Sequence, residues 1–259
     1  MASNQVIIKT ERDLQAMRPA CVVAGTVLDE VAHFIRPGIT TREIDQFAAE
    51  RIKQYGAKSA FLNYRKYPCN ICISVNDEVV HGLATDRRVN FGDIVSLDVG
   101  VRYNGYIGDT ARTVAVGGCN LHAQHLMDIT ERALNVGIEQ AVVGNRVVDI
   151  SRAVQEYVES NGFSVVREFV GHGVGKSVHE EPQVPNFVEN NKSSPKLRVG
   201  MTIAIEPMVN AGGSDVQVLK DGWTVVTKDG QLSAHFEHTV LITDSEPEIL
   251  TLVKQGVVR

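Results

Sequence analysis

The feature that most constrains the fold of this chain is an internal repeat, in which the second half follows the plan of the first. Equivalent glycines and isoleucines recur 106 residues apart in three pairs: Gly38 with Gly144, Ile44 with Ile150, and Gly56 with Gly162. Each half predicts two amphipathic helices followed by strand-rich sequence. The sequence therefore predicts an α+β fold with pseudo-twofold symmetry and a site between the halves.

Capping residues help to place the helices. We expect helices over residues 11–35, 42–56, 119–142 and 147–162 and strands over 70–80, 93–101, 106–116, 202–212, 223–230 and 233–243. Thr10 is the expected N-cap of the first helix, and Thr40 with Glu43 has the spacing of a capping box. Gly56, like its partner in the repeat, is expected to end a helix. Pro19 is expected to bend or interrupt the first helix.

The composition limits the domain organisation and the partners. Of 259 residues, 43% are hydrophobic and 22% are charged, which suits a full core and argues against disorder. No proline- or serine-rich linker stands near the middle, so we expect a single domain over residues 1–259, with pseudo-repeats at about 10–116 and 120–250. A net charge of −5 gives no reason to expect nucleic acid or an anionic membrane as the main partner.

The chain start and the cysteines indicate the compartment. The first residues lack the basic start and apolar run of a secretion signal, and no stretch approaches the ~18 apolar residues needed to span a bilayer. Four cysteines are too few for a disulfide-dense secreted scaffold. Cys69 and Cys72 form a C-x-x-C pair, but the sequence has no second pair to complete a structural zinc site. We therefore expect a cytoplasmic protein.

Two aspartates stand in segments that otherwise have the pattern of strands. Strands disfavour aspartate, yet Asp98 and Asp109 each lie among β-branched and apolar residues. Asn104 and Gly105 between them are typical of a two-residue hairpin turn, which would pair Asp109 with Gly100 and put Asp98 on the same face. Like charges that converge on a half-buried sheet repel, and burial raises the cost. Because a bound cation would remove that cost, the hairpin predicts a metal site.

The second half supplies further candidates for the same site. Glu206 lies 108 residues after Asp98, close to the repeat spacing, and Glu237 is a carboxylate in the last predicted strand. His172 and His179 stand seven positions apart in a glycine-rich run, which does not match the helical zinc motif H-E-x-x-H. His172 with four carboxylates would form a hard, oxygen-rich site for two divalent ions across the repeat interface.

Each of these residues also has an ordinary structural interpretation. A single aspartate in a strand is commonly a turn or edge residue. His172 alone could be a hydrogen-bonded core or loop histidine, and Glu206 before Pro207 could merely end a strand. The metal site is the favoured hypothesis because five such residues occur together in a largely repeated pattern.

Longer stretches of the sequence resemble one known family. The stretches are VVHGLATDRRVNFGDIVSLDVG, GYIGDTARTVAVG, FVGHGVGKSVHEEPQVPNF, GMTIAIEPMV and EHTV. They resemble the signature blocks of type I methionine aminopeptidases, which have the pita-bread fold, and the resemblance covers roughly residues 10–250. Without an N-terminal zinc-binding extension or a long insertion in its second half, the chain is most similar to the short, single-domain bacterial type.

The resemblance implies a dinuclear metal centre that hydrolyses a peptide bond. The implied metal ligands are Asp98, Asp109, His172, Glu206 and Glu237. The implied reaction removes the initiator methionine from a polypeptide whose second residue is small, with a water activated by the two metals. Glu206 would carry a proton from that water to the leaving amine. His179 would donate to the carbonyl oxygen as it gains charge, and His81 would hydrogen-bond the scissile nitrogen or help to protonate it.

The resemblance also implies an apolar pocket for the methionine side chain. The residues expected to bind substrate are Phe61, Tyr64, Tyr67, Cys72, His81, His179 and Trp223. The chain departs from the commonest bacterial pattern at Phe61, where a cysteine is expected, and at Val178, where a phenylalanine is expected. These two changes would compensate each other if they move one aromatic ring across the pocket.

Cofactors and partners follow from the same resemblance. The ligand set accommodates cobalt, manganese, iron(II), zinc or nickel. A monovalent cation, sodium or potassium, would be held by backbone oxygens of Asn76, Glu78 and Ser233. The expected partner is the N-terminus of a peptide or nascent chain that begins with methionine. A monomer that associates transiently with the ribosome is a further expectation.

Two alternative hypotheses stay open from the sequence. A relative with the same fold and metals could act on Xaa-Pro peptides, although such enzymes usually carry a further N-terminal domain, for which the residues before Thr10 leave no room. A catalytically silent pita-bread protein could bind peptides or histones, but such proteins typically lose metal ligands, and all five are present here.

Overall fold

Both predicted helix pairs form, and the second helix of each pair has the same register in the two halves. A computed structural model of the chain describes residues 5–189 and 194–253. The helices are α1 (Glu11–Phe34), α2 (Thr41–Gln54), α3 (Leu121–Glu139) and α4 (Val147–Ser160), with a 3-10 turn η1 (Tyr64–Lys66). Helices α2 and α4 begin 106 residues apart, which is the repeat spacing of the sequence.

The ends of these helices follow the expected capping chemistry. The Thr10 hydroxyl accepts a hydrogen bond from the third residue of α1, and Thr40 does the same for α2. Gly56 and Gly162 follow α2 and α4 with φ of 71° and 81°, a conformation that ends a helix readily at glycine. The sequence therefore predicts these boundaries correctly.

The expected interruption of the first helix at Pro19 does not occur. Helix α1 contains Pro19 as an interior residue, and Met17 and Cys21 on either side of it are fully buried. Proline removes one helical hydrogen bond, but packing of a buried helix face contributes more to helix stability than a single such bond. Tertiary packing therefore keeps this helix continuous.

The strands form one large and two small sheets. They are β1 (Lys58–Ser59), β2 (Cys72–Val75), β3 (Glu78–Val80), β4 (Ile94–Tyr103), β5 (Tyr106–Ala115), β6 (Ser164–Val165), β7 (Gly171–Gly173), β8 (Glu180–Val184), β9 (Thr202–Ile205), β10 (Met208–Asn210), β11 (Val216–Val218), β12 (Val225–Thr227), β13 (Ser233–His235), β14 (Glu237–Leu241) and β15 (Glu248–Ile249). The large sheet has the order β1-β4-β5-β14-β9-β7-β8, with β2 on β4 and β15 on β14. The small sheets are β13-β10-β6 and β11-β12-β3.

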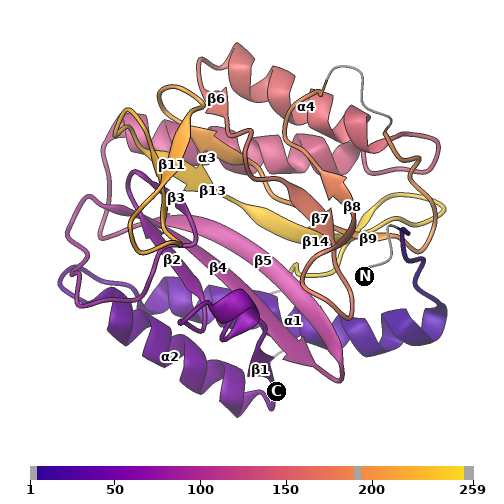
Figure 1. Ribbon diagram of the computed structural model, residues 1–259, viewed down its shortest axis with the longest axis horizontal. Helices are drawn as coiled ribbons and strands as arrows, with labels where there is room; N and C mark the ends of the chain where they lie inside the picture. The colour runs from indigo at the N-terminus through magenta and orange to yellow at the C-terminus, as the bar shows by residue number, and fades with distance from the viewer. Residues whose placement is uncertain (1–4, 190–193, 254–259) are drawn as a thin grey trace.

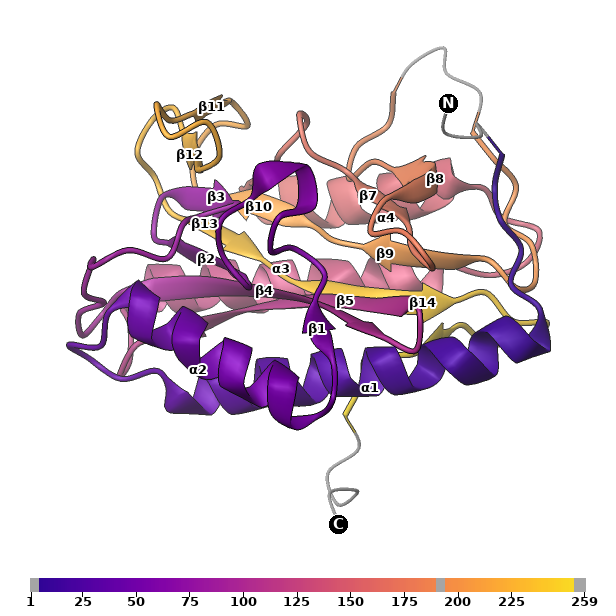
Figure 2. The same cartoon turned by 60° about the horizontal axis from the view of Figure 1, so that its bottom comes forward.

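Helices cover one side of the large sheet and leave the other side to loops. Helix α1 packs on β4 and β5, while α3 packs on α4 and on strands of the second half. Figure 2 shows α1 and α2 along the lower side of the sheet, with η1 and the β11–β12 hairpin on the upper side. A Cβ on Gly108 would lie 2.5 Å from the Cα of Cys21, so this strand position faces α1 closely. Because side chains alternate along a strand, Asp109 points to the opposite side.

The predicted hairpin forms with the predicted register. Strands β4 and β5 pair Gly100 with Asp109 and Asp98 with Ala111. Asn104 at the turn has a φ of 50°, as a two-residue turn of the expected type requires. The two aspartates are therefore diagonal neighbours on one face of the sheet, and that face lies away from α1.

Strand pairing joins the two halves at two places, β5 with β14 in the large sheet and β3 with β12 in a small one. Strand β5 of the first half lies beside β14 of the second half (Figure 1). In this pairing Glu237 lies opposite Ala111. The Thr110 hydroxyl donates to the carbonyl of Glu237 at 2.8 Å, and the Thr239 hydroxyl donates to the carbonyl of Asp109 at 2.7 Å. The large sheet thus carries carboxylates from both halves on adjoining strands. Among the described residues, no helix combines the length and the apolar character needed to cross a bilayer.

Candidate active site

One cavity of about 230 Å³ gathers every residue predicted to bind a divalent metal, to catalyse or to bind methionine. It lies on the side of the sheet away from α1. The predicted residues among its walls are Phe61, Tyr64, Tyr67, Cys72, His81, Asp98, Asp109, His172, His179, Glu206, Trp223 and Glu237. Segments from both halves of the chain therefore meet here, as the repeat suggested.

The acidic floor of the cavity has donor atoms that converge. Ligand atoms of Asp109, His172 and Glu237 all lie within 4.8 Å of one another. The Nε2 atom of His172 lies 3.3 Å from Oε1 of Glu206. Four buried carboxylate oxygens here have no hydrogen-bond partner within the described structure: Asp98 Oδ1, Asp109 Oδ1, Glu206 Oε1 and Glu237 Oε1. Buried polar atoms without partners are costly, and cations are the partners that such a set of oxygens fits.

His172 faces this cluster with a lone pair. Its Nδ1 lies 3.0 Å from the carbonyl oxygen of Gly173. A carbonyl only accepts, so Nδ1 carries the proton in this contact and Nε2 is left as an acceptor. When Glu206 is ionised, its carboxylate and Nε2 are two electron-pair donors that face each other, and a cation between them would turn this repulsion into attraction.

Burial governs the protonation of these acids when no cation is near. It raises the pKa of Asp98 to about 7, and a hydrogen bond with the Cys72 thiol offsets part of that rise. Burial first, and the neighbouring carboxylates second, raise the pKa values of Asp109, Glu206 and Glu237 well above their ordinary range. A site that disfavours four negative charges so strongly is suited to divalent cations.

His179 lies between residues of both halves. Its ring stands 4.4 Å from the ring of His172 and 5.4 Å from the ring of Tyr64, measured between centroids. Its Nδ1 lies 2.8 Å from the Tyr64 hydroxyl. Burial lowers the pKa of His179 to about 3, with a smaller effect from His172, so the imidazole is neutral near pH 7.

His81 enters the cavity from an unusual backbone conformation. Its φ is 60°, in a region that residues other than glycine rarely adopt. Its ring meets Phe169 and Trp223 edge-on, at centroid distances of 5.5 and 6.4 Å. The Tyr67 hydroxyl donates to the carbonyl of Gly82 at 2.8 Å and so fixes the backbone beside His81. Burial lowers the pKa of His81 to about 4.

Comparisons with known proteins identify the family. A model described as Metallopeptidase family M24 matches residues 15–244. The methionine aminopeptidase of Clostridium perfringens is 51% identical over 249 residues, which cover 96% of this chain and 100% of that protein. The chain belongs to metallopeptidase family M24.

Within family M24, the chain belongs with the methionine aminopeptidases. The crystal structure of methionine aminopeptidase from Thermotoga maritima superposes with a TM-score of 0.93 at 44% identity, over 96% of this chain and 100% of that one. The prolidase from Pyrococcus furiosus superposes with a TM-score of 0.79 at 25% identity, over 96% of this chain but 66% of that one. The predicted resemblance and the predicted α+β pita-bread fold are thus confirmed.

The apolar wall of this metallopeptidase contains the two departures noted in the sequence. The ring of Phe61 packs closely against β4 at Gly100, since a Cβ on Gly100 would lie 2.4 Å from a ring carbon of Phe61. Val178 is 2% exposed and lines the same cavity. An aromatic ring therefore stands on the β4 side of the pocket, and an aliphatic group on the side of His179. Compensation between them stays a prediction.

Three further residues at the M24 site were not predicted from the sequence. Arg65 and Phe169 line the cavity, and Arg65 has a φ of 49°. His235 is 2% exposed, and its Nε2 has no hydrogen-bond partner among the described residues and lies 3.8 Å from Oε2 of Glu206. Burial lowers the pKa of His235 to about 3. The available signal was its position two residues before Glu237 in the strand predicted over 233–243, because alternate residues of one strand share a face.

The residues expected to bind a monovalent cation lie in a separate place. The N–H of Ser233 donates to the carbonyl of Asn76 at 2.9 Å, and Asn76 has a φ of 60°. The Glu78 carboxylate accepts from the N–H of Val75 at 2.8 Å and from Arg87 at 2.7 Å. Asn76 and Ser233 are thus neighbours, while their role toward a cation stays a prediction.

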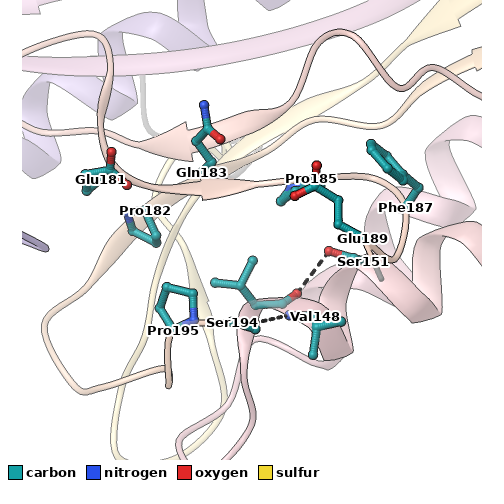
Figure 3. A pocket seen from close by; sticks show the side chains of 11 residues that line it. Val148, Ser151, Glu181, Pro182, Gln183, Pro185, Phe187, Glu189, Ser194 and Pro195 are labelled. Carbon is teal, nitrogen blue, oxygen red and sulfur yellow. Dashed lines mark hydrogen bonds between the residues drawn. The ribbon is translucent and has the colours of Figure 1, made fainter. Parts of the chain in front are cut away.

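A second cavity of about 190 Å³ lies at the start of α4 (Figure 3). Its described walls are mainly Val147, Val148, Pro182, Pro185, Phe187 and Pro195, and none of them is a residue predicted to catalyse or to bind metal. In one wall of this cavity, the hydroxyl of Ser194 accepts from the N–H of Val148 at 2.8 Å. This region therefore supports the helix start and lies apart from the acidic cluster.

Proposed function

We propose that this protein is a metal-dependent aminopeptidase that removes the N-terminal methionine from polypeptides whose second residue is small. The observation that carries the proposal is one cavity in which buried carboxylates without hydrogen-bond partners among the described residues adjoin aromatic and sulfur-containing side chains. The floor supplies hydrolytic chemistry, and the wall suits a thioether side chain. The relatives from Clostridium perfringens and Thermotoga maritima are both named methionine aminopeptidase, and this chain covers 100% of each.

The metal ions would be held by Asp98, Asp109, His172, Glu206 and Glu237. The donor set fits this use, because buried carboxylate oxygens and the lone pair of His172 converge without other partners. When bound, divalent ions supply a Lewis acid for the scissile carbonyl and lower the pKa of a water molecule. The choice among cobalt, manganese, iron(II), zinc and nickel depends on metal availability in the cell as well as on affinity.

Glu206 is the proposed carrier of the proton between the attacking water and the leaving amine. Its carboxylate extends from the end of β9 into the cavity and has one buried oxygen without a hydrogen-bond partner among the described residues. Its pKa without a cation is raised by burial, so the group accepts a proton more readily than an ordinary glutamate.

Two neutral histidines complete the proposed machinery. Nδ1 of His179 is free to accept the proton of the Tyr64 hydroxyl, in which case Nε2–H is available to donate to the substrate carbonyl oxygen as negative charge develops. His81 would hydrogen-bond the scissile nitrogen. The methionine side chain would contact Phe61, Tyr64, Tyr67, Cys72 and Trp223.

Further parts of the proposal concern the whole protein. We propose that residues 1–259 act as a single catalytic domain, since the large sheet is shared by both halves. We also propose a cytoplasmic monomer that meets nascent chains, with transient ribosome association. A sodium or potassium ion would be held by backbone oxygens of Asn76, Glu78 and Ser233, of which Asn76 and Ser233 are hydrogen-bonded neighbours.

The test is a peptide panel assayed with each metal in turn. Met-Gly, Met-Ala and Met-Leu peptides and an Ala-Pro peptide are incubated with the metal-free protein plus cobalt, manganese, iron(II), zinc or nickel, and released amino acids are quantified. We expect methionine from Met-Gly and Met-Ala, much less from Met-Leu, and little cleavage of Ala-Pro. The Glu206→Gln variant is the inactive control.

Two outcomes would contradict the proposal. Preferred cleavage of the Ala-Pro peptide would favour the Xaa-Pro alternative. Binding of peptides without methionine release under any metal would favour a catalytically silent peptide-binding protein.

A further inference from the structure

A buried ion pair outside the cavity joins the segment before α1 to the loop that carries His179. The Nζ atom of Lys9 lies 2.7 Å from Oε2 of Glu180, and the two side chains are 4% and 6% exposed. The residues are 171 positions apart in the sequence. A buried charge pair is stable only when further hydrogen bonds satisfy its remaining atoms, so the other partners of Glu180 show what the pair holds.

Those partners are backbone groups of the loop between β7 and β8. Oε1 of Glu180 accepts from the N–H of Lys176 at 2.8 Å and from the N–H of Ser177 at 3.2 Å. Lys9 is itself fixed, because its own N–H donates to the carbonyl of Gly200 at 2.8 Å. The carboxylate thus binds one ammonium and two amides at once.

The same loop is held on its other side by the β4–β5 hairpin. The N–H of Ile107 donates to the carbonyl of Gly175 at 2.8 Å, and Arg102 donates to the carbonyl of Lys176 at 3.0 Å. Val178 and His179, which follow Ser177, line the active-site cavity. The backbone is therefore fixed immediately before the histidine, and Glu180 immediately follows it.

We propose that the Lys9–Glu180 pair positions His179 for the reaction, so that residues before the first helix control a catalytic group of the second half. The inference rests on the proposed function, in which His179 donates to the substrate carbonyl. Without the ammonium, the buried carboxylate loses its charged partner, and its hold on the two amides changes. A displacement of about 1 Å at a catalytic group can lower turnover on the order of 100-fold.

The experiment compares a buried and an exposed lysine. Lys9→Met keeps most of the stem and removes the charge, whereas the matched control Lys228→Met removes a lysine whose pair with Asp215 is exposed. We expect Lys9→Met to lower kcat about 10- to 100-fold on a Met-Ala peptide while KM and bound metal stay nearly unchanged. By NMR, the amides of Lys176 and Ser177 should exchange faster and the His179 ring signals should shift. Lys228→Met should match the wild type in every readout.

A double variant separates positioning from general stability. In Lys9→Met/Glu180→Gln, a neutral amide oxygen replaces the unpaired carboxylate as the acceptor for the N–H groups of Lys176 and Ser177. This double variant should therefore have a higher kcat than Lys9→Met alone. Wild-type kcat and slow amide exchange in Lys9→Met would overturn the proposal, and so would a loss of kcat that merely follows a loss of bound metal. If Lys9→Met does not fold, Glu180→Gln enters the same measurements with the same criteria.

A parallel variant separates this proposal from the proposed function. If His179→Ala keeps wild-type kcat, His179 has no catalytic role. In that case kcat cannot report whether the Lys9–Glu180 pair positions His179. The amide exchange and the ring signals of His179 then decide whether Lys9 and Glu180 fix the loop, since neither readout needs turnover. Unchanged exchange and unchanged signals in Lys9→Met would overturn the positioning role in that case too.

Discussion

The two halves of the chain supply the site in different ways. The first half places Asp98 and Asp109 on the single hairpin β4–β5, whose register follows from a local turn. The second half places His172 on β7, Glu206 after β9 and Glu237 on β14, three segments that meet only when the large sheet is complete. The second half of the site therefore depends on pairings of greater sequence separation, which cost more loop-closure entropy than a hairpin.

The largest expected effect tests whether both halves are needed. Asp109→Asn removes a carboxylate of the first half, and Glu237→Gln removes one of the second half. Each should lower methionine release more than about 100-fold, because even groups one step removed from a metal typically contribute 10- to 100-fold. Bound metal, measured by mass spectrometry, should fall in both variants.

The control for this pair is Asp128→Asn on the exposed side of α3, which should retain activity and metal. If only one of Asp109→Asn and Glu237→Gln loses metal, the two halves of the chain do not contribute to one metal centre.

A smaller effect is expected where the halves touch through Tyr64 and His179. His179→Ala should lower kcat on the order of 100-fold, as loss of one donor to a developing oxyanion does. Tyr64→Phe removes only the hydrogen bond to Nδ1, so it should lower kcat roughly 5- to 10-fold. Because burial holds the pKa of His179 at about 3, neither variant should remove a titration between pH 5 and 8. Steady-state kinetics from pH 5 to 8 measures kcat for both variants. Equal falls in kcat would contradict the larger effect expected for His179→Ala.

The metal-free protein should lose stability as the pH rises, because the site carboxyls of both halves have raised pKa values. The folded chain then binds more protons than the unfolded chain above the ordinary carboxyl pKa, so the free energy of unfolding falls with increasing pH. From pH 7 to 8.5 the buried histidines are mostly neutral in both states and contribute little. Each carboxyl that is still protonated in the folded chain lowers the free energy of unfolding by up to about 1.4 kcal/mol per pH unit.

Urea unfolding at pH 7 and 8.5, with and without manganese, measures this effect. Saturating metal should reduce the fall, and Glu237→Gln should reduce it in the metal-free protein. A metal-free protein that is more stable at pH 8.5 than at pH 7 would show that burial does not raise the pKa values of the site carboxyls.

The smallest expected effect concerns the two equivalent helix starts. Thr40 caps α2 from its own position, with its hydroxyl accepting from Glu43 N–H at 3.1 Å. The equivalent residue before α4 is Arg146, which offers no acceptor, and Ser194 supplies the hydroxyl from a distant loop (Figure 3). Thr40→Ala and Ser194→Ala should each cost about 1 kcal/mol of unfolding free energy. Ser160→Ala, at the exposed end of α4, should cost less in the same urea titration, and an equal cost would contradict the distant cap.

The sequence predicts features that depend on neighbouring residues better than features that depend on contacts between distant segments. The hairpin register, the caps of α1 and α2 and the repeat spacing depend on neighbouring residues, and they form as expected. The residues of the site were predicted to meet, and they line one cavity, although their individual roles stay predictions. Long motifs of a known family made this possible.

What the sequence did not predict depends on packing between distant segments. Strands β7 and β8 are short and lie in glycine- and proline-containing sequence, so no periodicity marks them. The approach of His235 to Glu206 requires β13 and the end of β9 to be placed together, and the interruption expected at Pro19 was overridden by burial of α1. The Lys9–Glu180 pair spans most of the chain and leaves no local pattern.

The seam between β5 and β14 has a mechanical consequence. The two halves share a hydrogen-bonded sheet, reinforced by the contacts of Thr110 and Thr239, and this sheet resists a hinge motion of one half against the other. Tyr64 and Arg65 of η1 and Trp223 of the β11–β12 hairpin line the cavity, so these segments border the space for a bound chain end. Pulled from its two ends, the molecule should rupture as one unit, with a single force peak.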